Sequence, residues 1–259
     1  MEFCKKIIFI SLLFILSGKA FGQKTNANEF LFGFQLRPII PNAYLNTDIE
    51  TSSSPNFSYT AKSNVGISFG SIIRKPLGKF WNLETGLNFV KRSYSLGFNL
   101  NDSVQVNSKQ NMTFIAYEIP IQALIYVRLG KAWYMNASAG ISLDFFPSET
   151  ETFSSEKVDS TFYDFSQKTY RIKWSALAAQ SNLGFEYRTE KQGYYYLGAS
   201  FHRPFGRIAG SQATVETTAG SERLWLSLSG SYFSVDLKYF LYDKYKTKKA
   251  VINDDLFLP

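Results

Sequence analysis

The sequence predicts an all-β fold, an eight-stranded antiparallel up-and-down barrel that spans a membrane. Three observations predict it. Apolar and polar residues alternate through eight stretches, the gaps between these stretches are alternately long and short, and an apolar leader precedes them. Alternation puts successive side chains on opposite faces of a strand. Alternately long and short gaps are typical of transmembrane barrels, in which tight turns join the strands on one side and longer loops join them on the other.

The leader, residues 1–22, has the features of a cleavable signal peptide. Lys5 and Lys6 precede an apolar run at positions 7–16, and Ala20-Phe21-Gly22 offers small residues for cleavage. The run has about ten residues, whereas a membrane-spanning helix needs roughly 20. We therefore expect export and removal of the leader rather than a helical anchor.

Cys4 is the only cysteine and precedes the apolar run, so it cannot become the lipidated first residue of a mature lipoprotein. A mature chain without cysteine can form neither disulfides nor thiolate metal sites. We expect three segments in all: the signal peptide at 1–22, the barrel at 23–242 and a periplasmic tail at 243–259.

The first four expected strands alternate apolar side chains with polar or small ones. Their apolar residues include Phe30, Phe32, Phe34 and Leu36 in 29–40, Val65, Ile67, Phe69 and Ile73 in 63–74, Trp81, Leu83, Leu87 and Phe89 in 80–96, and Tyr117, Ile119, Ile121 and Ile125 in 112–128. The short gap 75–79 contains Pro76 and Gly78, which favour a turn.

The next three expected strands follow the same rule. Their apolar residues include Trp133, Met135, Ala137 and Ile141 in 132–145, Leu177, Leu183, Phe185 and Tyr187 in 170–188, and Tyr195, Leu197, Ala199 and Phe201 in 194–204. Short turns are expected at 129–131 and 189–193.

The eighth stretch, 222–242, changes the parity of its apolar residues near Gly230. They are even-numbered before it (Leu224, Leu226) and odd-numbered after it (Phe233, Val235). A bulge at Gly230 would reconcile the two halves, because one extra residue exchanges the faces of a strand. The alternative is two separate strands and a count of nine. We favour eight, because an even count puts both chain ends on the side of the short turns.

The four long gaps are expected to be polar loops on the side opposite the short turns. They cover residues 41–62, 97–111, 147–168 and 205–221. The third is acidic and also contains aromatic residues. With its flanking residues it forms segment 146–169, which we consider, beside the tail, as a surface for protein partners.

The polar face of the strands is expected to line the barrel interior, and the apolar face to meet lipid. Small residues and charges of both signs share the polar face, and a narrow eight-stranded interior has to be filled by side chains. The charged residues are Arg37, Arg74, Glu84, Arg92, Glu118, Arg128, Asp144, Glu186, Arg188 and Asp236. Trp81, Trp133 and Tyr195 start strands beside short turns, where an aromatic belt is expected. A soluble, lipocalin-like ligand-binding barrel with the opposite orientation is the alternative.

The interior should then be a packed polar plug. Wide pores need about 16 strands, so a general diffusion porin is not expected. No later stretch is long and apolar enough to be a spanning helix.

His202 is the only histidine, and Ser200 and Glu186 are the residues that could join it in a catalytic triad. In that alternative the chain is an enzyme that modifies outer-membrane lipid. Residues that face the interior cannot readily reach lipid, and no Gly-x-Ser-x-Gly or phosphate-binding loop occurs. We therefore predict no enzymatic activity, no catalytic, cofactor-binding or metal-binding residues, and no cofactor.

The formal net charge is +7, without a marked basic cluster before the tail. The expected partners are outer-membrane lipids and lipopolysaccharide, and protein partners through segment 146–169 or the tail. Nucleic acid is not expected.

The segment Tyr117-Glu118-Ile119-Pro120-Ile121, which precedes the Leu129-Gly130-Lys131 turn, carries a family resemblance together with the leader and the eight stretches. Roughly from residue 29 to 242, the chain resembles the outer-membrane β-barrel family of Bacteroidetes, which includes proteins similar to PorT. The resemblance implies a barrel in the outer membrane of a Gram-negative bacterium with a structural or accessory role. Some members belong to a secretion system.

One departure from that family is the tail after Tyr242, since many outer-membrane barrels end on the aromatic residue used for assembly. Phe240 and Tyr242 would be an internal version of that signal.

Overall fold

The computed structural model describes residues 30–41, 49–55, 57–77, 81–100, 107–147, 149–158, 161–189, 192–217 and 220–241. Every element within these ranges is a β-strand. No helix in the described part of the chain is long and apolar enough to cross a membrane. The expected signal peptide and tail lie outside the described residues.

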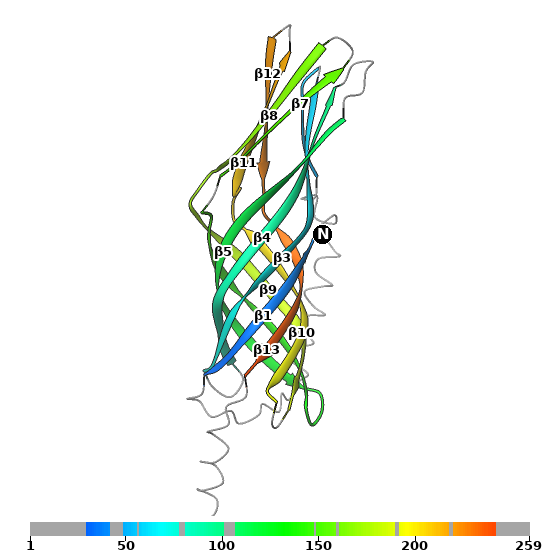
Figure 1. Cartoon of the computed structure of the whole chain (residues 1–259). Helices are drawn as coiled ribbons and strands as arrows, with labels where there is room; N and C mark the ends of the chain where they lie inside the picture. The colour runs from blue at the N-terminus through cyan, green and yellow to red at the C-terminus, as the bar shows by residue number, and fades with distance from the viewer. Residues whose placement is uncertain are drawn as a thin grey trace, which may run out of the picture.

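Eight strands form a closed antiparallel barrel (Figure 1), as predicted. They are β1 (Leu31–Ile40), β3 (Phe57–Pro76), β4 (Trp81–Leu100), β5 (Asn107–Arg128), β6 (Trp133–Phe145), β9 (Ser175–Arg188), β10 (Tyr194–Pro204) and β13 (Tyr232–Phe240). The order around the barrel is β1-β13-β10-β9-β6-β5-β4-β3, and pairing between β3 and β1 closes it.

The remaining strands extend beyond one end of the barrel, drawn at the top of Figure 1. There β12 (Gly220–Leu228), β11 (Ala209–Thr217), β8 (Thr161–Arg171) and β7 (Thr150–Val158) form a second sheet in that order. The fifth, β2 (Ile49–Ser53), pairs with the upper part of β3. We call these five strands, with the upper ends of β3, β4 and β5, the extension.

The extension corrects the expectation that the long gaps are loops. Strands β4 and β5 occupy most of the gap 97–111, the hairpin of β7 and β8 occupies most of 147–168, and β11 lies in 205–221. Strands β4 and β11 show why they were missed: their apolar residues here, such as Leu96, Phe98 and Val215, point inward, the reverse of the membrane-spanning rule.

Strand β4 shows this reversal on one unchanged face. Its even-numbered residues point inward from Asn82 to Phe98. In the lower half they are polar, as at Glu84 and Asn88, and in the upper half they are apolar, as at Leu96 and Phe98. The inward residues of the extension form a hydrophobic cluster, the upper core, which includes Tyr59, Leu96, Phe98, Phe114, Phe146 and Leu226.

The same reversal explains the parity change near Gly230, and the bulge expected there is wrong. Even-numbered residues point inward both before and after Gly230, so Leu226 enters the upper core and Asp236 enters the barrel. The stretch is divided into β12 and β13, which lie in different sheets, and Gly230 between them has a φ of 69°. A bulge that does exchange the faces lies in β3, between Asn64 and Ile67.

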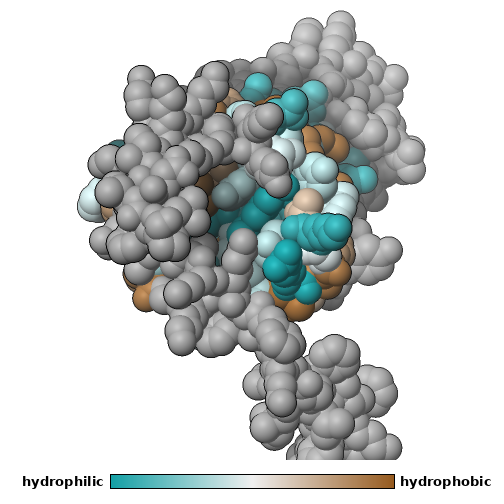
Figure 2. Space-filling model, turned by 90° about the horizontal axis from the view of Figure 1, so that it is seen from below, coloured by the Kyte–Doolittle hydropathy of each residue, from teal (hydrophilic) through white to brown (hydrophobic). Residues whose placement is uncertain are grey.

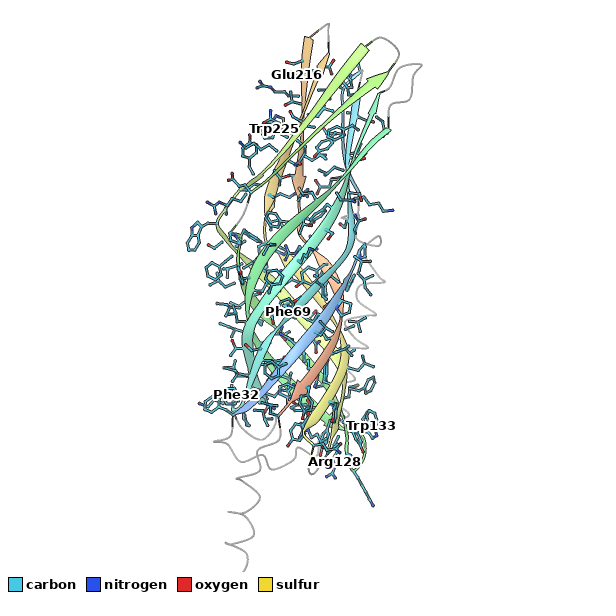
Figure 3. All side chains as sticks on the ribbon, in the orientation of Figure 1. Phe32, Phe69, Arg128, Trp133, Glu216 and Trp225 are labelled. Atoms are coloured by element: carbon cyan, nitrogen blue, oxygen red, sulfur yellow. The ribbon has the colours of Figure 1, made fainter. Side chains whose placement is uncertain are left out.

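The orientation of the barrel wall is the predicted one. Leu87, Ile121 and Ile125 are 40 to 51% exposed on the outside, whereas Glu84 and Glu118 are at most 4% exposed. From below, hydrophilic residues surround the hollow of the barrel and hydrophobic ones lie on the outer wall (Figure 2). Trp133 lies at the end with the short turns (Figure 3), where an interfacial aromatic is expected.

Inward glycines make room for large side chains in the narrow interior. A Cβ atom on Gly184 would lie 2.4 Å from the Tyr196 hydroxyl oxygen and 2.5 Å from the Gly198 Cα. The Tyr196 hydroxyl donates to Asn182 Oδ1 at 2.5 Å. The space left by Gly184 and Gly198 therefore lets a tyrosine lie across the inner wall.

We predict that Gly184→Val destabilises the barrel, because backbone atoms on the neighbouring strand leave no space for a side chain. Overpacking of this kind costs about 1–3 kcal/mol. The variant should unfold at lower urea concentration and lose its heat-modifiable mobility on gels at lower temperature. Gly206→Ala is the matched control, because a Cβ there meets no atom within 4 Å. Equal stability of the two variants would contradict the prediction.

Candidate functional site in the barrel lumen

The lower half of the lumen contains an ion-pair cluster that spans the barrel. Arg74 on β3 donates to Glu84 on β4 at 2.7 Å and to Glu186 on β9 at 2.6 Å. Lys238 on β13 donates to the other oxygen of Glu84 at 2.6 Å, and Arg188 pairs with Glu186 at 2.6 Å. Since β3 and β9 are four strands apart in either direction around the barrel, the bond from Arg74 to Glu186 crosses the lumen.

Aromatic rings complete the lower cluster. The Arg74 guanidinium lies 4.0 Å from the centre of the Phe240 ring, and that of Arg188 lies 4.0 Å from the centre of the Tyr134 ring. Planar guanidinium groups stack well on aromatic faces. The cluster therefore fills space with rings as well as balancing charge.

A second cluster, nearer the extension, is centred on Glu118 of β5. One Glu118 oxygen accepts from Arg92 at 2.9 Å and the other accepts from Arg37 at 3.1 Å. The Tyr232 hydroxyl lies within 2.9 Å of both oxygens. Three other barrel strands thus supply donors to one buried carboxylate.

His202 and Asp144 adjoin this upper cluster. His202 Nε2 lies 2.9 Å from Asp144 Oδ2 and 3.7 Å from Glu118 Oε1, and the imidazole stacks on Tyr232 with ring centres 4.8 Å apart. Glu118, Asp144 and His202 could each offer one ligand atom to a metal ion, and these atoms lie within 4.8 Å of one another. Both Glu118 oxygens already accept from cationic guanidinium groups, which disfavours a metal cation there. We interpret the group as part of the ion-pair network.

The three residues of the catalytic alternative lie in separate networks. Ser200 donates to Asp236 and accepts from Asn182 Nδ2 at 2.9 Å. His202 contacts Asp144, and Glu186 binds Arg74 and Arg188. No described hydrogen bond joins Ser200 to His202, and Ser200, His202 and Glu186 are at most 2% exposed. The arrangement therefore lacks a nucleophile activated by a base and open to lipid.

The lumen charges balance within the described residues. The carboxylates are Glu84, Glu118, Asp144, Glu186 and Asp236, and the cations are Arg37, Arg74, Arg92, Arg188 and Lys238. Equal numbers of both signs limit the free energy cost of placing charges in a site of low dielectric constant.

The upper core lies above the Glu118 cluster and packs mainly apolar side chains at that end of the barrel. The rings of Tyr59 and Phe98 stack with centres 4.9 Å apart, and those of Phe114 and Phe146 lie 5.5 Å apart. Tyr59 shares a hydrogen bond of 2.7 Å with Ser211. Burial raises the pKa of the Tyr59 hydroxyl to about 12, although the bond with Ser211 acts in the opposite direction, so this phenol stays neutral.

Most of the charges predicted for the polar face lie in the lumen. Arg128 is the exception: it is exposed at the lower end, where its Nε donates to the Gly130 carbonyl at 3.0 Å (Figure 3). Lys238 and Tyr232 were missed, although both share the even parity of Asp236 on β13. Their even position numbers, which place them on the inward face with Asp236, were the signal that could have identified them.

Comparison with known proteins gives one matching family and several similar solved structures. The family described as "Outer membrane protein beta-barrel domain" matches residues 21–206. The outer membrane protein OprG from Pseudomonas aeruginosa is similar at 11% identity, over 83% of this chain and 96% of that one, with a TM-score of 0.48. The translocator domain of the autotransporter NalP from Neisseria meningitidis is similar at 13% identity, over 92% of this chain and 96% of that one, with a TM-score of 0.21. Among curated protein sequences there was no match.

We predict that Glu118→Gln lowers the free energy of unfolding by about 3–5 kcal/mol, because two buried guanidinium groups lose their carboxylate. Urea titration of the refolded protein in detergent micelles measures the change. The matched control is Arg207→Ala, which removes a half-exposed ion pair with Glu50 on the extension. That loss should cost no more than about 1 kcal/mol. Equal losses would show that the buried cluster has no special role.

Proposed function

The chain belongs to the outer membrane protein β-barrel domain family, and we propose that it is a closed, non-enzymatic outer-membrane barrel that anchors the extension and displays it to a partner. The observation that carries this proposal is the filled interior. Ion pairs cross the membrane-spanning half of the lumen, and the upper core occupies the half above it. A barrel whose interior is filled by ion pairs in one half and by the upper core in the other is suited to anchoring rather than to transport.

The extension is the part available to a partner. In outer-membrane barrels the short turns face the periplasm and the longer connections face outward, so the extension is proposed to be extracellular. It is a rigid structure rather than a set of loops, because its inward side chains pack in the upper core and Ser54 donates to Glu222 at 2.7 Å, which joins the end of β2 to β12. The partner surface proposed for segment 146–169 thereby becomes the hairpin of β7 and β8.

Several finer assignments belong to this proposal. Residues 1–22 direct export and are then cleaved, and the tail 243–259 is proposed to lie in the periplasm. The barrel wall contacts lipid, and the extension contacts lipopolysaccharide. Similarity to PorT and a role in a secretion system are supported by the leader, the eight alternating stretches and the segment from Tyr117 to Ile121.

We predict that the purified protein forms no stepwise ion channels in planar lipid bilayers. A general diffusion porin in the same detergent is the positive control. The double variant Arg74→Ser/Glu186→Ser removes the pair that crosses the lower lumen, together with the pairs of Arg74 with Glu84 and of Arg188 with Glu186. It should also remain closed, because the upper core is intact. Stable conductance steps from the unmodified protein would contradict the proposal.

The lipid-modifying alternative gives a separate prediction. Cells that express Ser200→Ala or His202→Gln should have the same lipid A composition as cells that express the unmodified protein, because both side chains are buried away from lipid. Mass spectrometry of extracted lipid A measures this, with a strain that lacks the protein as reference. A lipid A species that depends on the protein and disappears in both variants would establish the enzyme instead.

A further inference from the structure

The outer face of the extension carries a polar groove on β8, β11 and β12. Cross-strand pairing aligns the outward residues in three rows, because directly paired residues share a face. The rows are Ser166, Thr214 and Arg223; Lys168, Gln212 and Trp225; and Tyr170, Gly210 and Ser227. The groove has a volume of about 360 Å³ and is lined by Ser166, Gln167, Lys168, Tyr170, Gln212, Thr214 and Arg223. Trp225 is the cross-strand partner of Gln212 and lies beside this lining.

Two aromatic rings form an apolar platform at one side of this groove. Trp225 is 58% exposed, and its ring lies 6.4 Å from that of Tyr170 with an angle of 27° between the planes. Lys168 Nζ lies 5.2 Å from the centre of the Tyr170 ring. Trp225 lies on the extension, well away from Trp133 at the opposite end (Figure 3). A large aromatic surface left in water on a rigid sheet is characteristic of an interaction site.

Polar side chains line the groove beside the platform. Gln212, Thr214 and Ser166 offer amide and hydroxyl groups that both donate and accept hydrogen bonds. Arg223 and Lys168 bring positive charge, and among the described lining residues none is acidic. Glu216 faces outward on β11 beyond this lining, toward the tip of the extension (Figure 3).

We infer that this groove binds a saccharide that carries a carboxylate or phosphate group. The apolar face of a pyranose ring stacks on an exposed aromatic ring, its hydroxyls need alternating donors and acceptors, and an arginine beside them pairs with an anionic substituent. All three elements occur here within three adjacent strands. The inference rests on the proposed function, because it names the partner class of the displayed extension.

Two sources could supply this chemistry: the core oligosaccharide of lipopolysaccharide in the same membrane, and an acidic polysaccharide from outside the cell. Both would reach the outer face of the extension, and neither could enter the filled barrel. The shared recognition is that of an anionic sugar, so the experiment uses one probe for each source.

Gly210 provides a structural means of blocking the groove. It lies at an outward position between Tyr170 and Ser227, and a Cβ there would meet only the Leu226 carbonyl oxygen, at 3.9 Å. A leucine at this position fits the backbone and projects beside the aromatic platform. It therefore obstructs a ligand without disturbing the fold.

The test is calorimetric titration of the full-length protein, refolded in detergent free of lipopolysaccharide. The probes are oligogalacturonate, phosphorylated core oligosaccharide released from lipopolysaccharide, and neutral dextran oligomers. We expect at least one anionic probe to bind, and to bind at least about tenfold more tightly than dextran. Trp225→Ala, Arg223→Ala and Gly210→Leu should each weaken that binding by about tenfold or more, which corresponds to about 1.4 kcal/mol.

The matched control is Trp174→Ala, because Trp174 is 67% exposed but lies outside the groove. It should leave the affinity unchanged. Binding of the core oligosaccharide alone would identify the membrane source, and binding of oligogalacturonate would identify the external one. No binding of either anionic probe, equal binding of dextran, or full affinity in Trp225→Ala and Gly210→Leu would overturn the inference.

Folding of each variant is checked by its heat-modifiable mobility on gels. Because the groove variants leave the lumen intact, failure of saccharide binding would not alter the conductance result. The two proposals can therefore fail separately.

Discussion

A strand that runs from hydrocarbon into water has to reverse which of its two faces is apolar. In the membrane the surroundings are hydrocarbon, so apolar side chains point outward and polar ones point to the axis. Above the membrane the surroundings are water, so burial of apolar surface favours the inward face. Strand β4 changes from inward Glu84 to inward Leu96 without changing its face. The polar lumen, the upper core and the rigid extension all follow from this reversal.

The charged side chains of the lumen in turn constrain the register in which the barrel strands pair. Every buried carboxylate needs a cation or hydrogen-bond donors, because an unpaired charge in a site of low dielectric constant is costly. The donors come from strands far apart in the sequence, as when Arg74 of β3 reaches Glu186 of β9. A register shift of one residue would turn an entire row of charges toward lipid. The ion pairs therefore favour a single register of the closed barrel.

Alternation in the sequence was sufficient to predict eight barrel strands and the inward position of most charges, because side-chain direction has a period of two. It was insufficient for the extension, because alternation defines two faces without saying which solvent each one meets. Leu224 and Leu226 were thus interpreted as a lipid-facing row displaced by a bulge at Gly230, whereas they point into the upper core. The pairs within the lumen were not predictable either. Which residues meet across a barrel depends on strand tilt and stagger, and a single sequence gives neither.

The carboxylate of Glu118 lies where the two interiors meet. On the same inward face of β5, Phe114 and Ala116 belong to the upper core, and Glu118 below them binds Arg37, Arg92 and Tyr232. An ion that entered from below would have to displace fixed charges of both signs. It would then meet a mainly apolar region whose buried polar groups, such as Tyr59 and Ser211, bond to one another. An apolar molecule that entered from above could pass among the apolar side chains of the upper core. It would then meet the charged groups of the lumen, which oppose an apolar solute. We propose that these two successive barriers oppose both classes of solute, and that a partner therefore binds on the outer face of the extension rather than along the axis of the barrel.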